Sequence, residues 1–310
     1  MSNEPFHDGE IAVQERVGER DIARRHGAAI SSCIAPGALA FLSQQRLLAL
    51  SATGDDRQVW TSVWIGEPGF VRSTDGQHVR ILTSLTEVSP DDPVRRRVAV
   101  GRDLGILAID LTSRRRLRIN GSIDAIAADE VSIVVRESVG NCPKYIQRRH
   151  PHEISTASSN RRPSEAGREI DEERRMRVER VDTAFVGSVH PTRGADASHR
   201  GGAPGFIKVV DATTLCVPDY PGNSMFMTLG NFEIDPRAGL AVVDFEDRRV
   251  VSFSGSARLR FEVEDPRHPT GGTGRYWDFR VREWVQFDLL PTVRWEQQDV
   301  SPYNPSTPQK

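Results

Sequence analysis

Four consecutive residues, Ser198 to Gly201, combine the residue types that an anion site uses. The guanidinium of Arg200 is a planar fork that can contact a phosphate through two parallel hydrogen bonds. Ser198 and His199 could add donors, and Gly201 lets the backbone approach an anion closely. We therefore treat this run as a candidate phosphate-binding segment.

Neutral hydrogen-bond donors further along the chain could complete such a site. Asn223, Thr228 and Asn231 fall across a loop and a predicted short helix. A helix N-terminus nearby would favour a doubly charged anion. The alternative is a polar turn followed by a capped helix, in which these side chains bond only the local backbone. The residues alone leave both interpretations open.

Arginines also cluster at two other places in the sequence. Arg114, Arg115 and Arg116 are consecutive and lie between two predicted strands. Arg248 and Arg249 form a similar pair later in the chain. One interpretation is a solvated hairpin turn. The other is that Arg115 and Arg116 reach a bound phosphate across the interface between two modules.

Cys142 is the best candidate for a nucleophile. A catalytic thiol needs a lowered pKa, which usually comes from a nearby histidine or a helix N-terminus. His150 and His152 follow Cys142, but they lie in a polar segment that has the composition of a linker. A structural role, or one at the edge of a bound ligand, is therefore favoured for Cys142.

Metal and nucleotide motifs are missing from the sequence. His7 with Glu10, and His190 with His199, match no zinc-ligand spacing, so we predict no metal site. No GxGxxG and no GxxxxGK[ST] pattern occurs, which leaves no sequence basis for a Rossmann or P-loop site.

The charge balance and the cysteines limit the partners and the compartment. The chain has 310 residues, with 41 Lys and Arg against 43 Asp and Glu. This balance argues against a nucleic-acid surface and a polybasic membrane anchor. No apolar run approaches the roughly 20 residues of a membrane-spanning helix. Cys33, Cys142 and Cys216 form no CxxC pair. We expect no secretory leader, no nucleic-acid or membrane partner, and a cytoplasmic location.

Hydrophobic patterning divides the chain into two strand-rich regions. Helical spacing of apolar residues predicts one or two short helices, and Pro36 with Gly37 ends that pattern. Short apolar or alternating runs after it predict strands. We divide the chain into a helical extension (1–37), a first β module (38–150), a polar linker (151–175), a second β module (176–296) and a frayed tail (297–310), with a helix predicted over 169–181.

The second strand-rich region echoes the first. Residues 66–71 resemble 202–207 at an offset of 136, and residues 105–110 resemble 239–244 at an offset of 134. A chance match is the alternative, since glycines and β-branched runs recur in any β protein. The shared order favours two copies of one β module that pack as an internal pseudo-dimer. Small barrels suit such a pattern because closure removes exposed sheet edges.

The two copies differ where the candidate anion segment lies. At the offset of 136, Ser62 corresponds to Ser198 and Trp64 corresponds to Arg200. A tryptophan in place of an arginine indicates divergence between the copies. One copy is then predicted to bind a ligand while the other packs.

The second module resembles the pyridoxamine 5'-phosphate oxidase-like FMN-binding split-barrel family. The order of several short blocks carries this resemblance, and each block alone is weak. The blocks are Asp196–Gly202, Leu215–Asn223, Thr228–Asn231, Asp235–Pro236 and Arg249–Gly255. With Phe6–Glu10 and Asn141–Gln147 included, roughly residues 5 to 296 resemble a bacterial branch of predicted flavin-nucleotide-binding proteins.

The resemblance implies a fold of two tandem split β-barrels, mainly β with minor α, and FMN as the cofactor. The cofactor-binding candidates are Ser62, Arg115, Arg116, Ser198, His199, Arg200, Gly201, Asn223, Thr228 and Asn231. No catalytic residue can be assigned. The oxidases of the family hold phosphate with a lysine and an arginine on the short helix, whereas residues 225–228 carry no cation. Pyridoxamine phosphate is therefore not the predicted substrate.

The predicted activity is a flavin-dependent oxidoreductase that acts on a small molecule. NAD(P)H or a redox partner protein would supply electrons, and association into a homodimer is left open. One alternative is a sensor without turnover that binds flavin, deazaflavin or haem on the same fold. Another is an interaction protein without a cofactor, which would be colourless and would gain no thermal stability from FMN.

Overall fold

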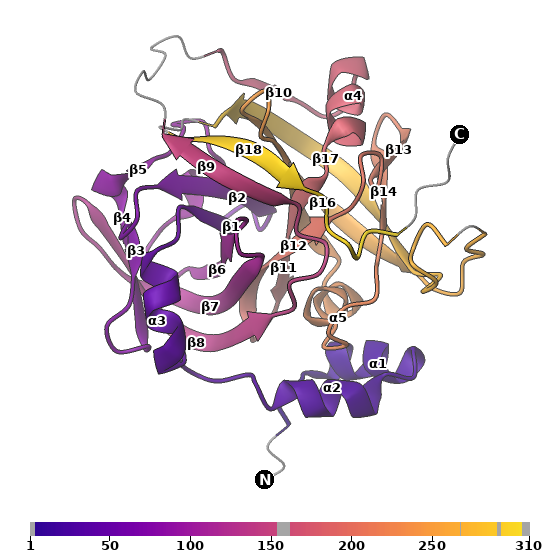
Figure 1. Cartoon of the computed structure of the whole chain (residues 1–310), viewed down its shortest axis with the longest axis horizontal. Helices are drawn as coiled ribbons and strands as arrows, with labels where there is room; N and C mark the ends of the chain where they lie inside the picture. The colour runs from indigo at the N-terminus through magenta and orange to yellow at the C-terminus, as the bar shows by residue number, and fades with distance from the viewer. Residues whose placement is uncertain (1–3, 154–161, 267, 290–292, 306–310) are drawn as a thin grey trace.

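The first half of the chain folds as one antiparallel sheet. The computed structural model describes residues 4–153, 162–266, 268–289 and 293–305 (Figure 1). The strands of this sheet are β1 (Leu47–Thr53), β2 (Val59–Gly66), β3 (Val71–Arg72), β4 (His78–Leu82), β5 (Thr86–Glu87), β6 (Asp103–Asp110), β7 (Arg115–Ile126) and β8 (Glu130–Asn141). Their spatial order is β3-β4-β8-β7-β6-β1-β2-β5.

The second half forms another antiparallel sheet. Its strands are β10 (Glu165–Gly167), β11 (Thr183–His190), β12 (Gly194–Gly201), β13 (Lys208–Asp211), β14 (Thr214–Pro218), β15 (Arg237–Asp244), β16 (Arg249–Arg260) and β17 (Tyr276–Asp288). The order is β12-β11-β15-β16-β17-β14-β13, and β10 pairs with β17. A separate ribbon joins β9 (Arg148–Glu153) to β18 (Val293–Asp299).

The two sheets share one topology. The order β3-β4-β8-β7-β6-β1-β2 in the first sheet is matched by β13-β14-β17-β16-β15-β11-β12 in the second. The similar sequence segments 105–110 and 239–244 lie in β6 and β15, which hold the same place in this order. The predicted fold class, mainly β with two tandem split-barrel modules, is confirmed.

Both modules contain a bulge at the same position. The register shifts between Asn120 and Gly121 in β7 and between Ser254 and Gly255 in β16. A Cβ atom on Gly121 would lie 2.2 Å from the carbonyl oxygen of Val134, and one on Gly255 would lie 2.1 Å from that of Arg280. Because no side chain fits there, glycine permits the bulge that bends each long strand.

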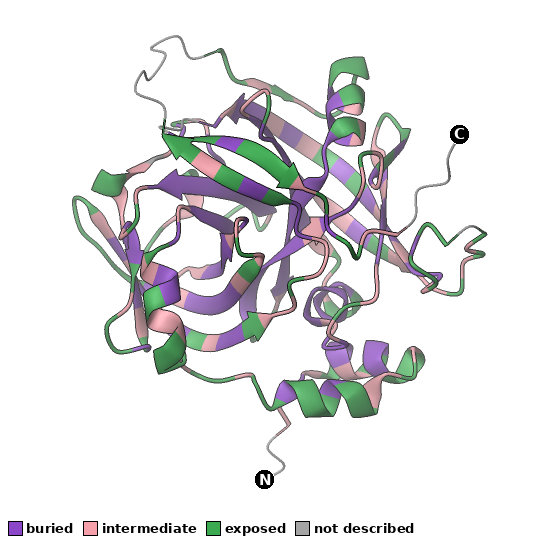
Figure 2. Cartoon of the chain, viewed as in Figure 1, coloured by how far each residue is buried: buried purple, intermediate pink, exposed green. Residues whose placement is uncertain are grey.

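Each module has its own apolar core, and a third core joins them. Trp60 belongs to the first core and Trp277 to the second. The third includes Leu47 of β1, Phe185 of β11 and Ala241 of β15, so it draws on both sheets. The central strands are accordingly buried along much of their length (Figure 2). Burial of apolar surface is the main term that holds the modules together.

The described residues form five α-helices around the sheets. They are α1 (Asp8–Arg16), α2 (Arg20–Gly27), α3 (Pro36–Ser43), α4 (Glu172–Arg180) and α5 (Met227–Ile234), with 3₁₀ turns η1 (Thr83–Leu85) and η2 (Arg95–Arg97). The helices α1 and α2 form a hairpin beside α5 (Figure 1). A capping box between His7 and Glu10 begins α1. Among the described residues, no helix has both the length and the apolar character to cross a membrane.

Three sequence predictions differ from the structure. Pro36 begins α3 instead of ending a helical pattern, because proline suits the first turn of a helix. The predicted linker contains β10, the first turn of α4 and the end of β9, while residues 154–161 lie outside the described residues. The predicted frayed tail starts inside β18, and the buried Ser301 beyond it donates its N–H to Gln147 (2.7 Å). Residues 306–310 lie outside the described residues.

Candidate functional site

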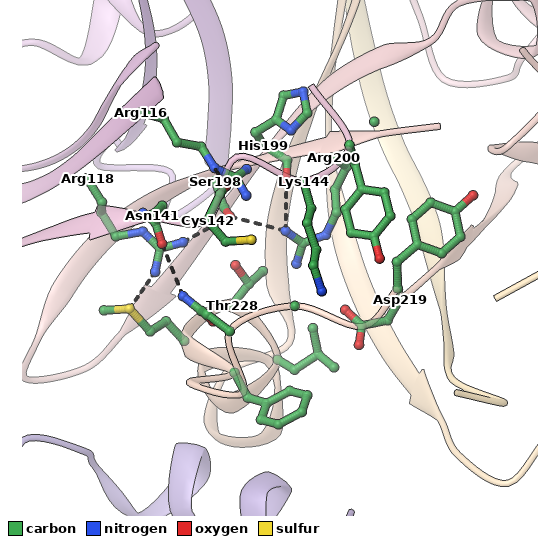
Figure 3. A pocket seen from close by; sticks show the side chains of 18 of the residues that line it. Arg116, Arg118, Asn141, Cys142, Lys144, Ser198, His199, Arg200, Asp219 and Thr228 are labelled. Atoms are coloured by element: carbon green, nitrogen blue, oxygen red, sulfur yellow. Dashed lines mark hydrogen bonds between the residues drawn. The ribbon is translucent and has the colours of Figure 1, made fainter. Parts of the chain in front are cut away.

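A cavity lies where the two modules meet the start of α5. Its empty volume is about 760 Å³, including the part open to solvent, and Figure 3 shows its side chains. The first module contributes residues of β7 and of the segment after β8, and the second contributes the end of β12 and the loop before α5. Both modules of one chain therefore build the cavity.

Most of the predicted site residues come together here. Those that line the cavity are Arg116, Ser198, His199, Arg200, Gly201, Asn223 and Thr228. They are far apart in the sequence, but β7 and β12 lie against each other where the sheets pack. Side chains alternate along a strand, so Ser198 and Arg200 share one face of β12 and point toward the cavity.

Two arginines of the cavity have no acidic partner. Arg116 donates from Nε to the carbonyl of Cys142 (2.7 Å). Arg200 donates to the hydroxyl of Ser198 (3.1 Å) and to the carbonyl of His199 (3.0 Å). No described carboxylate forms an ion pair with either arginine. Neither guanidinium is therefore neutralised by a contacting carboxylate, although the charges of Asp219 and Asp196 favour the charged form of Arg200.

The other charges near the cavity are already paired or lie at its rim. Arg118 contacts Asp196 (Nε to Oδ1, 3.1 Å) and donates to Ser198 (2.9 Å). Asp219 is the one carboxylate among the lining residues, and it accepts from Arg275 outside the cavity (3.0 Å). Lys144 lies over the ring of Tyr303 (5.5 Å). The cavity therefore carries an excess of positive charge.

This excess shifts the acid–base equilibria of the cavity. Burial, together with the charges of Arg118 and Arg200, lowers the pKa of Arg116 to about 9. Burial and Arg118 lower the pKa of Arg200 as well. The pKa of His199 lies well below its usual range because of burial first and then Arg116 and Arg200. A bound anion would relieve these penalties, since it favours the charged form of each arginine.

His199 is neutral at physiological pH and lacks hydrogen-bond partners. Neither Nδ1 nor Nε2 has a partner among the described residues, although the side chain is buried. Its ring stands edge-on to Phe185, with centroids 5.7 Å apart. Figure 3 shows the ring turned away from Asp219 and Thr228. His199 thus lies at the back of the cavity.

The start of α5 faces the cavity with free backbone donors. Met227 and Thr228 line the cavity, and no side chain caps the helix at Phe226. The first N–H groups of a helix lack partners within it, and the helix dipole favours an anion there. The backbone at the N-terminus of α5 therefore adds to the anion-binding character of the arginines.

Several lining residues hold an unfavourable backbone conformation. Tyr145, Ser224 and Phe226 have φ angles of 68°, 63° and 57°. For residues other than glycine, this left-handed region costs on the order of 1–3 kcal/mol and persists only when the surroundings hold it. Such residues cluster at functional sites more than elsewhere.

Three predicted site residues lie elsewhere. Ser62 is buried in β2 and donates to Asp92 (2.5 Å). Arg115 is exposed, with its guanidinium 4.7 Å from the ring centroid of Phe41. Asn231 donates to the hydroxyl of Ser188 (2.8 Å) inside the second module. None of the three lines the cavity.

The equivalent position on the other side of the pseudo-dimer has lost these cations. The strand registers identify the equivalent residues. Ser252 of β16 lies opposite Ala241 as Arg118 of β7 lies opposite Leu107, so Ser252 is the equivalent of Arg118. Two residues earlier on the same strands, Val250 is the equivalent of Arg116. Trp64 pairs with Leu48 as Arg200 pairs with Ala184. Burial raises the pKa of Asp92, the partner of Ser62, to about 6. None of the three described equivalents of Arg116, Arg118 and Arg200 is cationic.

The structure adds residues that sequence reasoning missed. Arg118, Lys144 and Asp219 line the cavity, as do Tyr145 and Tyr220, whose ring centroids lie 4.9 Å apart. Arg118 had a detectable signal, because it follows Arg116 by two residues on one strand and so shares its face.

Cys142 also lines the cavity, but the predicted histidine partners do not. His150 and His152 contact each other (ring centroids 5.1 Å), and His152 pairs with Glu296 on β18 (2.8 Å). A role for Cys142 at the edge of a ligand fits this placement, whereas neither His150 nor His152 lines the cavity with it. Within the described part of the chain, no His, Cys, Asp and Glu side chains form a group that could hold a metal ion.

No protein-family model and no curated protein sequence matches this chain. Solved structures do resemble parts of it. HupZ from Group A Streptococcus is 14% identical over 42% of this chain and 98% of its own, with a TM-score of 0.29. A Clostridium acetobutylicum protein of the pyridoxinephosphate oxidase family, related to general stress protein 26, is 12% identical over 37% and 80%, with a TM-score of 0.25. An F420 reductase is 14% identical over 34% and 89%, with a TM-score of 0.24. Scores this low carry no conclusion about a ligand or a reaction.

Proposed function

We propose that this chain binds a phosphorylated flavin, FMN in the first place, in the cavity between its modules and acts as a flavin-dependent oxidoreductase. The observation that carries the proposal is the pair of arginines, Arg116 and Arg200, that face the cavity without a carboxylate partner. A phosphate dianion is the ligand that such a pair suits best.

The residues present fit the phosphate of FMN. Arg116 and Arg200 would offset its charge, and Arg118 could donate from the guanidinium that already contacts Ser198. Thr228 and the first N–H groups of α5 would supply neutral donors. These groups replace the cations that residues 225–228 lack.

The protein would hold and orient the cofactor and control access of water. When bound, the flavin supplies the electron-transfer chemistry. Tyr145 and Tyr220, whose ring centroids lie 4.9 Å apart, form an aromatic part of the cavity lining. His199 cannot serve as a general acid near neutral pH, because its pKa lies well below its usual range. We propose NAD(P)H or a redox partner protein as electron donor and a small molecule as substrate.

Haem is the second candidate, and His199 is the observation that favours it. A neutral imidazole offers one nitrogen lone pair to iron, and neither ring nitrogen of His199 has a hydrogen-bond partner among the described residues. The direction of the ring, away from the cavity centre, argues for flavin ahead of haem. A deazaflavin phosphate would use the same arginines as FMN.

The absorption spectrum of the purified protein tests the proposal. It is recorded before and after addition of FMN and desalting. We expect the two-band flavin spectrum in at least the second sample. A sharp Soret band would move the assignment to haem. A protein that stays colourless and does not retain FMN would contradict the proposal for FMN.

We expect one FMN per chain. Val250, Ser252 and Trp64 stand at the positions equivalent to Arg116, Arg118 and Arg200, so these three positions offer no cation for a second phosphate. Isothermal titration calorimetry, in which FMN is added to the cofactor-free protein, measures the number of FMN molecules bound per chain. Two equivalents with similar affinity would show that the modules have not diverged in binding.

A further inference from the structure

We propose that the N-terminal hairpin of α1 and α2 is a positioning element for the anion site. It fixes the loop at residues 222–226 and the start of α5, and Gln14 is its central positioning residue. None of the described residues of the hairpin lines the cavity, so the hairpin can act on it only through the neighbouring segments that it contacts. The effect on a ligand rests on the proposed function, whereas the effect on the loop does not.

The loop needs an external support. The backbones of Ser224 and Phe226 both occupy the left-handed region, which residues other than glycine rarely adopt. Inside the loop, the side chain of Asn223 accepts from the N–H of Met225 (3.2 Å). One weak local bond does not explain two unfavourable residues. Such a conformation persists when surrounding contacts hold it.

The hairpin supplies hydrogen bonds beside each of these residues. Gln14 donates from Nε2 to the carbonyl of Met225 (2.9 Å), which lies between Ser224 and Phe226. His26 donates from Nδ1 to the carbonyl of Asn223 (2.6 Å), just before Ser224. The Gln14 side chain is fully buried, so its bond is sheltered from water.

Apolar contacts and a charged bridge add to this support. The side chain of Met225 packs in a cluster with Phe6 and Ala23 of the N-terminal segment. Arg275 donates to Asp219 in the cavity wall (3.0 Å) and to Glu19 between α1 and α2 (3.3 Å). The hairpin thus contacts the cavity wall at two separate places.

The helices α1 and α5 meet backbone to backbone. A Cβ atom on Gly9 would lie 2.2 Å from the carbonyl oxygen of Gly230, and one on Gly230 would lie 2.6 Å from the Cα of Glu10. His7 donates from Nε2 to the side chain of Asn231 beside this contact (3.0 Å). The position of α5, whose first residues face the cavity, is therefore set by α1 (Figure 1).

The test compares Gln14→Met with Gln45→Met. The methionine keeps the length and volume of glutamine but removes the amide, which at Gln14 donates to Met225 and also accepts from Arg20 within the hairpin (2.6 Å). Gln45 is a matched control, because it is also buried and donates from Nε2 to a backbone carbonyl, that of Phe41 (2.7 Å), in the first module. His26→Ala is a second variant at an exposed position, where misfolding is not expected.

Two measurements follow for each variant. Hydrogen exchange of residues 222–231 is recorded without ligand, and FMN affinity is recorded by flavin fluorescence. We expect Gln14→Met to speed exchange of this segment and to weaken FMN binding, each by about tenfold, as the loss of one buried hydrogen bond predicts. Gln45→Met should lower the melting temperature to a similar extent and leave both readouts unchanged.

The outcomes separate the two proposals. Unchanged exchange in both Gln14→Met and His26→Ala would overturn the positioning role, whatever FMN does. Faster exchange in a protein that binds no FMN even as wild type would leave the positioning role intact and remove the proposed function. A similar loss of FMN affinity in Gln14→Met and Gln45→Met would assign the loss to general destabilisation and overturn the inference.

Discussion

Replacement of Arg116 with alanine should weaken FMN binding by roughly ten- to a hundredfold, or about 1.5–3 kcal/mol, the usual contribution of a charged hydrogen bond. Arg116 faces the cavity, and within the described protein its guanidinium donates a hydrogen bond to the carbonyl of Cys142. A phosphate that loses this guanidinium has no replacement cation on β7 other than Arg118, which is already paired with Asp196.

The same substitution should not destabilise the cofactor-free protein. Burial and the neighbouring charges of Arg118 and Arg200 lower the pKa of Arg116 to about 9, so its charge is an unfavourable feature of the empty cavity. Residues that bind a ligand often lower the stability of the ligand-free protein in this way. We expect an unchanged or higher melting temperature for Arg116→Ala without FMN.

Arg115→Ala is the matched control for Arg116→Ala. It removes the same side chain one position earlier, where the guanidinium is exposed and lies over Phe41 on the opposite face of the strand. Titration of FMN by fluorescence quenching compares the two variants at low and moderate salt. Equal losses of affinity would assign the effect to general charge, and no loss in Arg116→Ala would refute the phosphate role.

A second large effect is expected from the pH dependence of folding, through Glu10. Burial raises the pKa of this carboxyl to about 8, and the charges of Glu137 and Asp196 add to the rise. A carboxyl of this kind binds its proton more tightly in the folded state than in the unfolded state. Its contribution to stability is complete below pH 4.5 and is lost as the pH rises toward 8.

His7, the neighbour of Glu10 in the capping box, has the opposite pH dependence. Burial and His190 lower its pKa to about 4, so it contributes stability above pH 6.5 and loses it as the pH falls toward 4. Between pH 4.5 and 6.5 the two effects oppose each other. Between pH 6.5 and 8, His7 no longer offsets the loss of stability from Glu10. The free energy of unfolding then falls by up to about 1.4 kcal/mol per pH unit.

Glu10→Gln isolates this effect, because glutamine resembles the protonated carboxyl. From pH 6.5 to 8, its free energy of unfolding should gain about 2 kcal/mol relative to wild type. Glu15→Gln is the control, an exposed position on the same helix. Urea denaturation at pH 5, 6.5 and 8 measures all three proteins. Parallel pH profiles for wild type and Glu10→Gln would contradict the raised pKa.

The strands and their tandem arrangement could be predicted because local patterns determine them. Alternation with period two identifies β7 as a strand, although the structure buries residues 117–121 on both faces instead of one. The apolar run at 105–110 identifies the buried β6. The order of similar segments then indicates two modules of one topology. Residues 297–299 show no such local pattern. They form a strand because they pair with β9, which lies about 150 residues earlier in the chain.

The candidate site could be predicted only in part. The run Ser198 to Gly201 attracted attention by residue type, and the structure places it at the cavity. Sequence alone cannot show whether an arginine faces solvent or a cavity, so Arg115 was included and Arg118 was overlooked. The contacts of Asn231 and Ser62 depend on segments far away in sequence, which is why their burial elsewhere was not foreseen.

The assembly of the cavity from both halves of one chain has a consequence for dilution. When such a cavity lies between two separate subunits, it disappears as the subunits dissociate at low concentration. Here the chain that joins the modules keeps their effective concentration high at any dilution, because their association is intramolecular. Ligand affinity measured at nanomolar protein should therefore equal the affinity measured at micromolar protein.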